Sequence, residues 1–156
     1  MKRLSWFISC GIAIFGVMIV QYFFQMKSET GSLGIVGIAL VFPFVLLCLF
    51  ITFHYFSYLA SLKVERVVQF IYFVFGLLFI GFLLYSALDY KNTVFMQLGG
   101  TIHDKDSAIY GMSWLNEHTS VIYFNFYTIL AAISTTAFIG YVRGLIKEQK
   151  EKELEN

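Results

Sequence analysis

The feature that most constrains this chain is a run of 29 residues, 34–62, that carries no formal charge at neutral pH. About 20 apolar residues in a helix cross the hydrocarbon core of a bilayer, so this run predicts a membrane-spanning helix. The whole chain is 58% hydrophobic and only 13% charged, whereas soluble domains average about 25% charged residues. A soluble fold of 156 residues has too little interior to cover that much apolar surface. The sequence therefore predicts an integral membrane protein.

Three further apolar runs have the length of a membrane span, which predicts an all-α, four-transmembrane-helix bundle formed by one domain, residues 1–156. The expected helices lie at about residues 4–26, 34–62, 67–88 and 120–146. A long loop, 89–119, joins the last two helices, and a charged tail, 147–156, follows the fourth. The turn after residue 62 is so short that the second and third helices are expected to be antiparallel neighbours.

The charges beside the helix ends predict the orientation, because Lys and Arg gather on the cytoplasmic side of a membrane. One side carries eight of these residues, namely Lys2, Arg3, Lys63, Arg66, Arg143, Lys147, Lys150 and Lys152. The other side carries three, namely Lys27, Lys91 and Lys105. A multi-pass protein with both termini in the cytoplasm and the 89–119 loop outside is the prediction. Abundant Phe, a single Pro and more Lys than Arg suggest an AT-rich bacterial genome, and the plasma membrane is the expected location.

A candidate polar site surrounds His54, the only titratable imidazole inside the apolar runs. Ionisable groups at membrane depth are costly and commonly mark a functional site that faces the bundle interior or a wet cavity. Helical spacing places further polar side chains on the same face of the second helix. A count of 1.5 Å per residue from the helix ends brings hydroxyl groups of the fourth helix to about the same depth. The predicted polar site consists of His54, Ser57, Tyr58, Ser61, Ser134 and Thr135. A proton or small-solute pathway and simple interhelical hydrogen bonding are the main alternatives. Metal or haem ligation is disfavoured, because no second intramembrane histidine is present to complete a bis-histidine pair.

Pro43 and the glycines are expected to shape the helices. Pro43 removes a backbone hydrogen bond, so a kink is expected in the second helix. Gly140 and Gly144 form a GxxxG pattern that allows close helix approach, and packing within the chain is favoured over a dimer contact. Cys10 and Cys48 are interpreted as small buried hydrophobes, and counting 1.5 Å per residue from the helix ends places them at depths roughly 12 Å apart.

The 89–119 loop is the candidate surface for docking a partner, since it is long for an idle connector. Its candidate docking residues are His103, Asp104, Asp106, Trp114, Glu117 and His118. These imidazoles and carboxylates match no metal-ligand spacing, so a solvated loop is favoured over a metal site. No catalytic residue, cofactor or metal is predicted.

Three functions remain open. The first is a non-enzymatic accessory or regulatory subunit, or an immunity-type partner, of another membrane protein. The second is an oligomeric transporter or channel subunit with a proton-sensitive pathway lined by His54. The third, a redox or lipid-modifying enzyme, is disfavoured because the sequence shows no cofactor ligands. The expected partners are the lipid bilayer and either a protein or further copies of the chain, and no nucleic acid.

Overall fold

The computed structural model describes residues 2–24, 33–60, 66–112 and 120–154. These residues form four long helices and one short one, with no strand among them: α1 (Lys2–Phe24), α2 (Leu33–Ala60), α3 (Arg66–Gln97), α4 (Ser120–Tyr123) and α5 (Phe126–Leu154). Three helices contain segments long and apolar enough to cross a membrane, Ala39–Ala60, Arg66–Gln97 and Phe126–Lys150, while α1 contributes a shorter apolar segment, Leu4–Ile19. The all-helical membrane fold is therefore supported.

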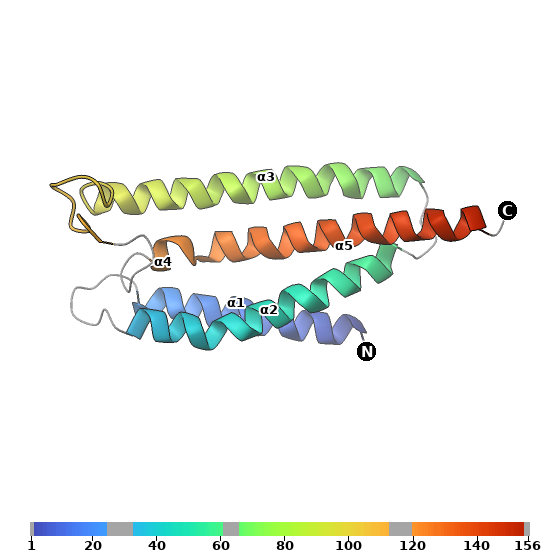
Figure 1. Ribbon diagram of the computed structural model, residues 1–156, viewed down its shortest axis with the longest axis horizontal. Coiled ribbons are helices and arrows are strands. Elements are labelled where there is room, and N and C mark those ends of the chain that lie inside the picture. The colour runs from blue at the N-terminus through green and yellow to red at the C-terminus, as the bar shows by residue number, and fades with distance from the viewer. Residues whose placement is uncertain (1, 25–32, 61–65, 113–119, 155–156) are drawn as a thin grey trace.

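The long helices alternate in direction, and both chain termini lie at the same end of the molecule (Figure 1). We call this end the terminus end. The opposite end, where residues 98–112 follow α3, is the loop end. α2 changes direction along its length (Figure 1), as expected for a helix that contains Pro43.

The helices do not form a closed bundle around one core. α5 packs on α2 and α3, while α1 packs mainly on α2. The described apolar core lies among α1, α2 and α5, and consists of Ala13, Val17, Val45, Cys48, Ile129 and Ile133. α5 therefore lies between α3 and the α1–α2 pair (Figure 1). The prediction that the second and third helices are packed neighbours was wrong, because a short turn restrains only the helix ends and α5 provides the larger contact.

The helix bounds also differ from the predicted ones. α3 continues to Gln97 instead of ending near residue 88, so its last turns occupy the expected loop. Two contacts accompany this extension: the Lys91 ammonium lies over the Phe95 ring, 5.6 Å from its centroid, and the Tyr90 and Tyr127 rings lie 6.1 Å apart. The polar segment of α3 beyond the apolar run thus makes side-chain contacts within α3 and with α5.

The fourth predicted helix is interrupted just before Phe126. Asn125 lies between α4 and α5 and caps α5. Its side-chain oxygen accepts a hydrogen bond from the Thr128 amide at 3.0 Å, and the Thr128 hydroxyl accepts one from the Asn125 amide at 3.0 Å. The Asn125 side chain also donates to the Ile122 carbonyl at 2.8 Å. This reciprocal capping satisfies a fully buried asparagine and explains why α5 starts anew.

Candidate functional site

Residues 98–112, which follow α3, fold into a compact loop that we call the tip loop. Backbone hydrogen bonds close it at two levels, from the Ala108 amide to the Leu98 carbonyl at 2.9 Å and from the Gly111 amide to the Ile102 carbonyl at 3.0 Å. Within it, the side chains of Ser107 and Ile109 are buried. Three glycines, Gly99, Gly100 and Gly111, have positive φ, which only glycine adopts readily.

Asp104 organises the outer turn of the tip loop. Its carboxylate accepts the Thr101 amide at 2.6 Å and the Thr101 hydroxyl at 2.8 Å. These two hydrogen bonds hold the pKa of Asp104 below its ordinary value of 3.8, because they favour the charged form. The Ser107 hydroxyl meanwhile donates to the Gly100 carbonyl at 3.0 Å. Asp104 and Ser107 thus build the loop, while the neighbouring side chains are exposed.

The exposed face of the tip loop contains His103, Asp104, Lys105 and Asp106. Three of the six predicted docking residues, His103, Asp104 and Asp106, are therefore exposed on the tip loop. The other three, Trp114, Glu117 and His118, lie outside the described residues. The role of Asp104 and Ser107 in folding the loop was not apparent from the sequence, although Thr101 and Asp104 have the spacing of a hydrogen-bonded polar turn.

His54 lies on an exposed face of α2. Its ring meets Phe50 edge-on, with centroids 4.5 Å apart, and Phe53 in the same manner at 5.5 Å. Tyr58, one turn further, is 46% exposed. The imidazole therefore points away from the core of the single chain, among aromatic side chains of its own helix.

The other members of the predicted polar site are spread over two helices. Ser57 is half-buried against α5, and Ser134 and Thr135 are half-buried on α5, whereas Ser61 lies outside the described residues. A β-carbon added to Gly140 would meet Phe53, and one added to Gly144 would meet Ser57, so α2 and α5 are parallel with an offset of 87 residues (140 − 53 and 144 − 57).

That register fixes the relative heights of the polar groups. The α5 residue level with His54 is Tyr141, six to seven residues beyond the two hydroxyls. At 1.5 Å per residue, Ser134 and Thr135 lie about 9–10 Å nearer the loop end. A pathway through these groups would have to be extended along the membrane normal rather than gathered in one layer.

The structure brings Cys10 and Cys48 together, which corrects the depth estimate. The Cys48 thiol donates to the Cys10 sulfur at 3.5 Å. The estimate failed because it assumed that the predicted helix ends share one plane, whereas the C-terminal end of α2 projects past the N-terminal end of α1 (Figure 1). Both thiols are free, and Cys48 is fully buried.

Hydroxyl and indole groups continue from the thiol pair toward the terminus end. The Cys48 sulfur lies 3.9 Å from the Thr52 hydroxyl, which accepts the Trp6 indole N–H at 3.0 Å. Trp6 stacks on Tyr55, with ring centroids 5.2 Å apart. The Ser9 hydroxyl donates to the Trp6 carbonyl at 2.9 Å and also contacts Cys48. We call Trp6, Ser9, Cys10, Cys48 and Thr52 the thiol cluster.

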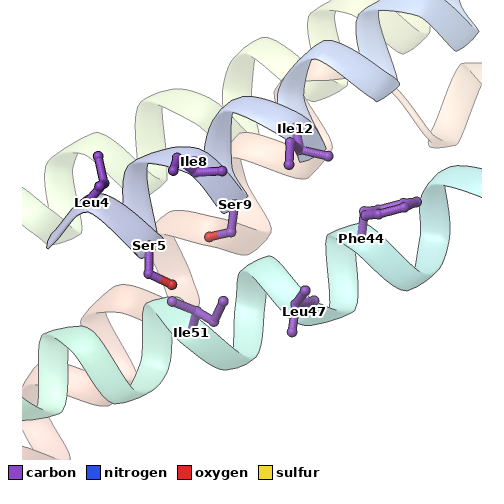
Figure 2. Close-up of a pocket in the computed structure, with 8 residues that line it drawn as sticks. All are labelled: Leu4, Ser5, Ile8, Ser9, Ile12, Phe44, Leu47 and Ile51. Carbon is purple, nitrogen blue, oxygen red and sulfur yellow. The ribbon is translucent and has the colours of Figure 1, made fainter. Parts of the chain in front are cut away.

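A groove of about 480 Å³ runs between α1 and α2 beside the thiol cluster. Figure 2 shows Ser5 and Ser9 of α1 pointing toward α2, opposite Ile51 and Leu47. The remaining lining is apolar and consists of Leu4, Ile8, Ile12 and Phe44. We call this feature the α1–α2 groove. No separate sequence motif marks it, since it depends on how the two helices diverge.

Comparison of the chain with known protein families, curated proteins and solved structures gives no match. The functional argument therefore rests on the residues and their geometry.

Proposed function

We propose that the chain is a small polytopic plasma-membrane protein without catalytic activity that acts as an accessory or regulatory subunit, or as an immunity-type partner, of another membrane protein. The observation that carries this proposal is the tip loop. It is folded by its own backbone hydrogen bonds and leaves His103, Lys105 and Asp106 exposed.

A preformed loop favours recognition because less freedom is lost when a partner binds. Ordering a flexible side chain at an interface costs about 0.5–1.5 kcal/mol, and an already ordered loop avoids further backbone cost. Charges of both signs on its exposed face can guide the encounter with a complementary surface. The tip loop is thus suited to binding a protein at the membrane surface while the helices anchor it in lipid.

The test compares partners recovered with the tagged protein from its native membrane in mild detergent. A loop variant, His103→Ala with Lys105→Ala and Asp106→Ala, removes exposed groups but keeps the structural residues Asp104 and Ser107. We expect a protein partner in stoichiometric amount with the wild type and with the control variant His54→Ala. We expect much less of that partner to be recovered with the loop variant. Recovery of the chain alone, or equal recovery with all three forms, would contradict the proposal.

A second candidate is an oligomeric transporter or channel subunit with a proton-sensitive pathway lined by His54. The exposed position of His54 and Tyr58 favours it, since side chains on an outer face can line a pathway only between copies or subunits. Flux of protons and small polar solutes into liposomes, compared between wild type and His54→Ala, tests this function. A pH-dependent flux that His54→Ala removes would favour transport over the accessory role.

A further inference from the structure

An exposed surface shared by α2 and α5 at the terminus end forms a second site, remote from the tip loop. We propose that Arg143, Lys147 and His54 hold the headgroup of an anionic phospholipid there, with its acyl chains lying along Ile139 and Phe50. We call these five residues the lipid site. The inference concerns the opposite end of the molecule from the tip loop and does not depend on the partner-binding role.

The order of charges along α5 is the first step of the argument. Residues 120–142 contain no Asp, Glu, Lys or Arg, and the first two charged residues of α5 are Arg143 and Lys147. Both are exposed, and they are four residues apart, so they lie on the same side of the helix. The acidic residues of α5 begin only at Glu148. An anionic headgroup at the edge of the hydrocarbon therefore meets positive charge first.

The side of α5 that faces α3 has different contacts. Tyr141 is buried there, with its ring 6.4 Å from the Tyr72 ring of α3. Glu148, two turns beyond Tyr141, interacts electrostatically with it. The first acidic side chain of α5 is thus on the α3 side, whereas Arg143 contacts α2.

Phe53 of α2 brings Arg143 and His54 together. The Arg143 guanidinium lies over the Phe53 ring, 5.2 Å from its centroid, and the His54 ring meets Phe53 edge-on with centroids 5.5 Å apart. The register of α2 and α5 places His54 about 3 Å nearer the loop end than Arg143. A guanidinium pairs with a phosphate through two parallel hydrogen bonds, and an imidazole N–H supplies a further donor. Contact with Phe53 restrains the arginine, which reduces the freedom lost on binding.

Apolar side chains continue from these polar groups toward the loop end. Ile139, one turn before Arg143, is 54% exposed, and Phe50, one turn before His54, is 63% exposed. The register between the helices places these two side chains at heights about 3 Å apart. A lipid in a bilayer leaflet has the same order, with its phosphate at the surface and its acyl chains toward the midplane. The lipid site therefore matches a phospholipid better than it matches free phosphate.

The first experiment measures lipid binding to the full chain by native mass spectrometry in a mild, uncharged detergent. Delipidated protein is titrated with phosphatidylglycerol and, separately, with phosphatidylcholine that has the same acyl chains. We expect phosphatidylglycerol to bind roughly ten-fold tighter, because only its headgroup has a net negative charge. Equal affinities of the wild type for the two lipids would overturn the proposal without recourse to any variant.

Competition with inorganic phosphate distinguishes a lipid from free phosphate as the occupant. At about hundred-fold molar excess over the lipid, inorganic phosphate should leave most of the phosphatidylglycerol bound, because it lacks acyl chains that bury apolar surface. Loss of most of the bound lipid at that excess would overturn the assignment of a phospholipid to this site.

A matched pair of arginines tests the headgroup position. Arg143→Gln removes the guanidinium beside Phe53, whereas Arg66→Gln removes an exposed arginine at the same end of the molecule, on α3. We expect Arg143→Gln to weaken phosphatidylglycerol binding about five-fold, the effect of one basic residue near an anionic surface, and Arg66→Gln to match the wild type. Arg143→Lys keeps the charge and should retain most of the affinity. Equal affinities of the two glutamine variants would overturn Arg143 as the headgroup ligand.

A matched pair of isoleucines tests the direction of the acyl chains. Ile139 lies one turn from Arg143 on the loop-end side, Ile146 lies about one turn away on the other side, and they are 54% and 50% exposed. We expect Ile139→Ser to weaken phosphatidylglycerol binding several-fold, because it removes apolar contact with an acyl chain. Ile146→Ser should bind as the wild type does. Equal effects of the two substitutions would overturn the placement of the acyl chains along Ile139.

Discussion

Gly140 determines how closely α5 approaches α2. A β-carbon at this position would lie 2.5 Å from the Phe53 carbonyl oxygen, and one at Gly144 would collide with the Ser57 carbonyl. Both obstacles are backbone atoms of α2, which cannot rotate away as a side chain can. The predicted packing of the GxxxG pattern within the chain is therefore confirmed, and the two glycines form part of the α5 surface that contacts α2.

Gly140→Ala is expected to destabilise the fold by about 1–3 kcal/mol, the range for overpacking a tight contact. The matched control is Gly81→Ala on α3, because a β-carbon there meets nothing within 4 Å and alanine favours a helix interior by about 1 kcal/mol over glycine. Unfolding in mixed detergent micelles, followed by circular dichroism, measures both. A Gly140→Ala variant as stable as the Gly81→Ala variant would contradict the close approach.

The tip loop should respond to acid through Asp104. The pKa of this carboxyl is lower in the folded loop than its ordinary value of 3.8, so the charged form stabilises the fold. This contribution is fully present above pH 3.8 and is lost as the pH falls through the lower, folded-state pKa. We expect hydrogen-exchange protection of the Thr101 amide to decrease in that acidic range.

Two variants test the acid response of the tip loop. Asp104→Asn removes the charge, so protection of the Thr101 amide should be low at all pH values. Asp106→Asn changes a neighbouring exposed carboxyl, and its acid response should match the wild type. Protection that stays constant down to the lowest pH at which the protein remains folded would rule out the Asp104 hydrogen bonds as its source.

At the scale of elements, α3 is attached to the rest of the molecule mainly through α5. Leu83 is the only side chain described as buried on α3. Phe138 of α5 forms much of the contact, since its ring lies 5.0 Å from the Phe73 ring and within 3.2 Å of the β-carbon position of Gly76. Helices in lipid associate largely through such close packing, because lipid tails are as apolar as the side chains.

Phe138→Ala should therefore loosen α3 while leaving the α1–α2–α5 core intact. Spin labels on α3 and α5 report the change by pulsed electron resonance, and we expect a broader distance distribution in Phe138→Ala than in the wild type. A label pair on α2 and α5 should keep its narrow distribution. Phe79→Ala, which removes a ring 46% exposed on α3, is the control and should resemble the wild type.

At the scale of the whole molecule, the sequence predicts which segments are helical better than it predicts which helices pack against each other. Each apolar run satisfies its backbone hydrogen bonds internally, so its helical state follows from lipid as the solvent. Which helices touch depends on small residues such as Gly140 and on the divergence of α1 and α2, neither of which loop length reveals. The cap at Asn125 could have been found, because Asn-x-x-Thr resembles a capping box. The thiol pair could not, because its depth depends on the relative heights of the helix ends.

The orientation in the membrane is the remaining whole-molecule prediction. Both termini lie at one end of the helices and the tip loop at the other (Figure 1), and among the described residues seven Lys and Arg belong to the terminus end against two at the loop end. Positive charge resists transfer across the membrane during insertion, so the terminus end should face the cytoplasm. In a Cys10→Ala/Cys48→Ala background, Lys105→Cys should react with a membrane-impermeant maleimide in intact cells. Lys150→Cys should react only after permeabilisation, and the reverse pattern would place the tip loop in the cytoplasm and remove its access to an external partner.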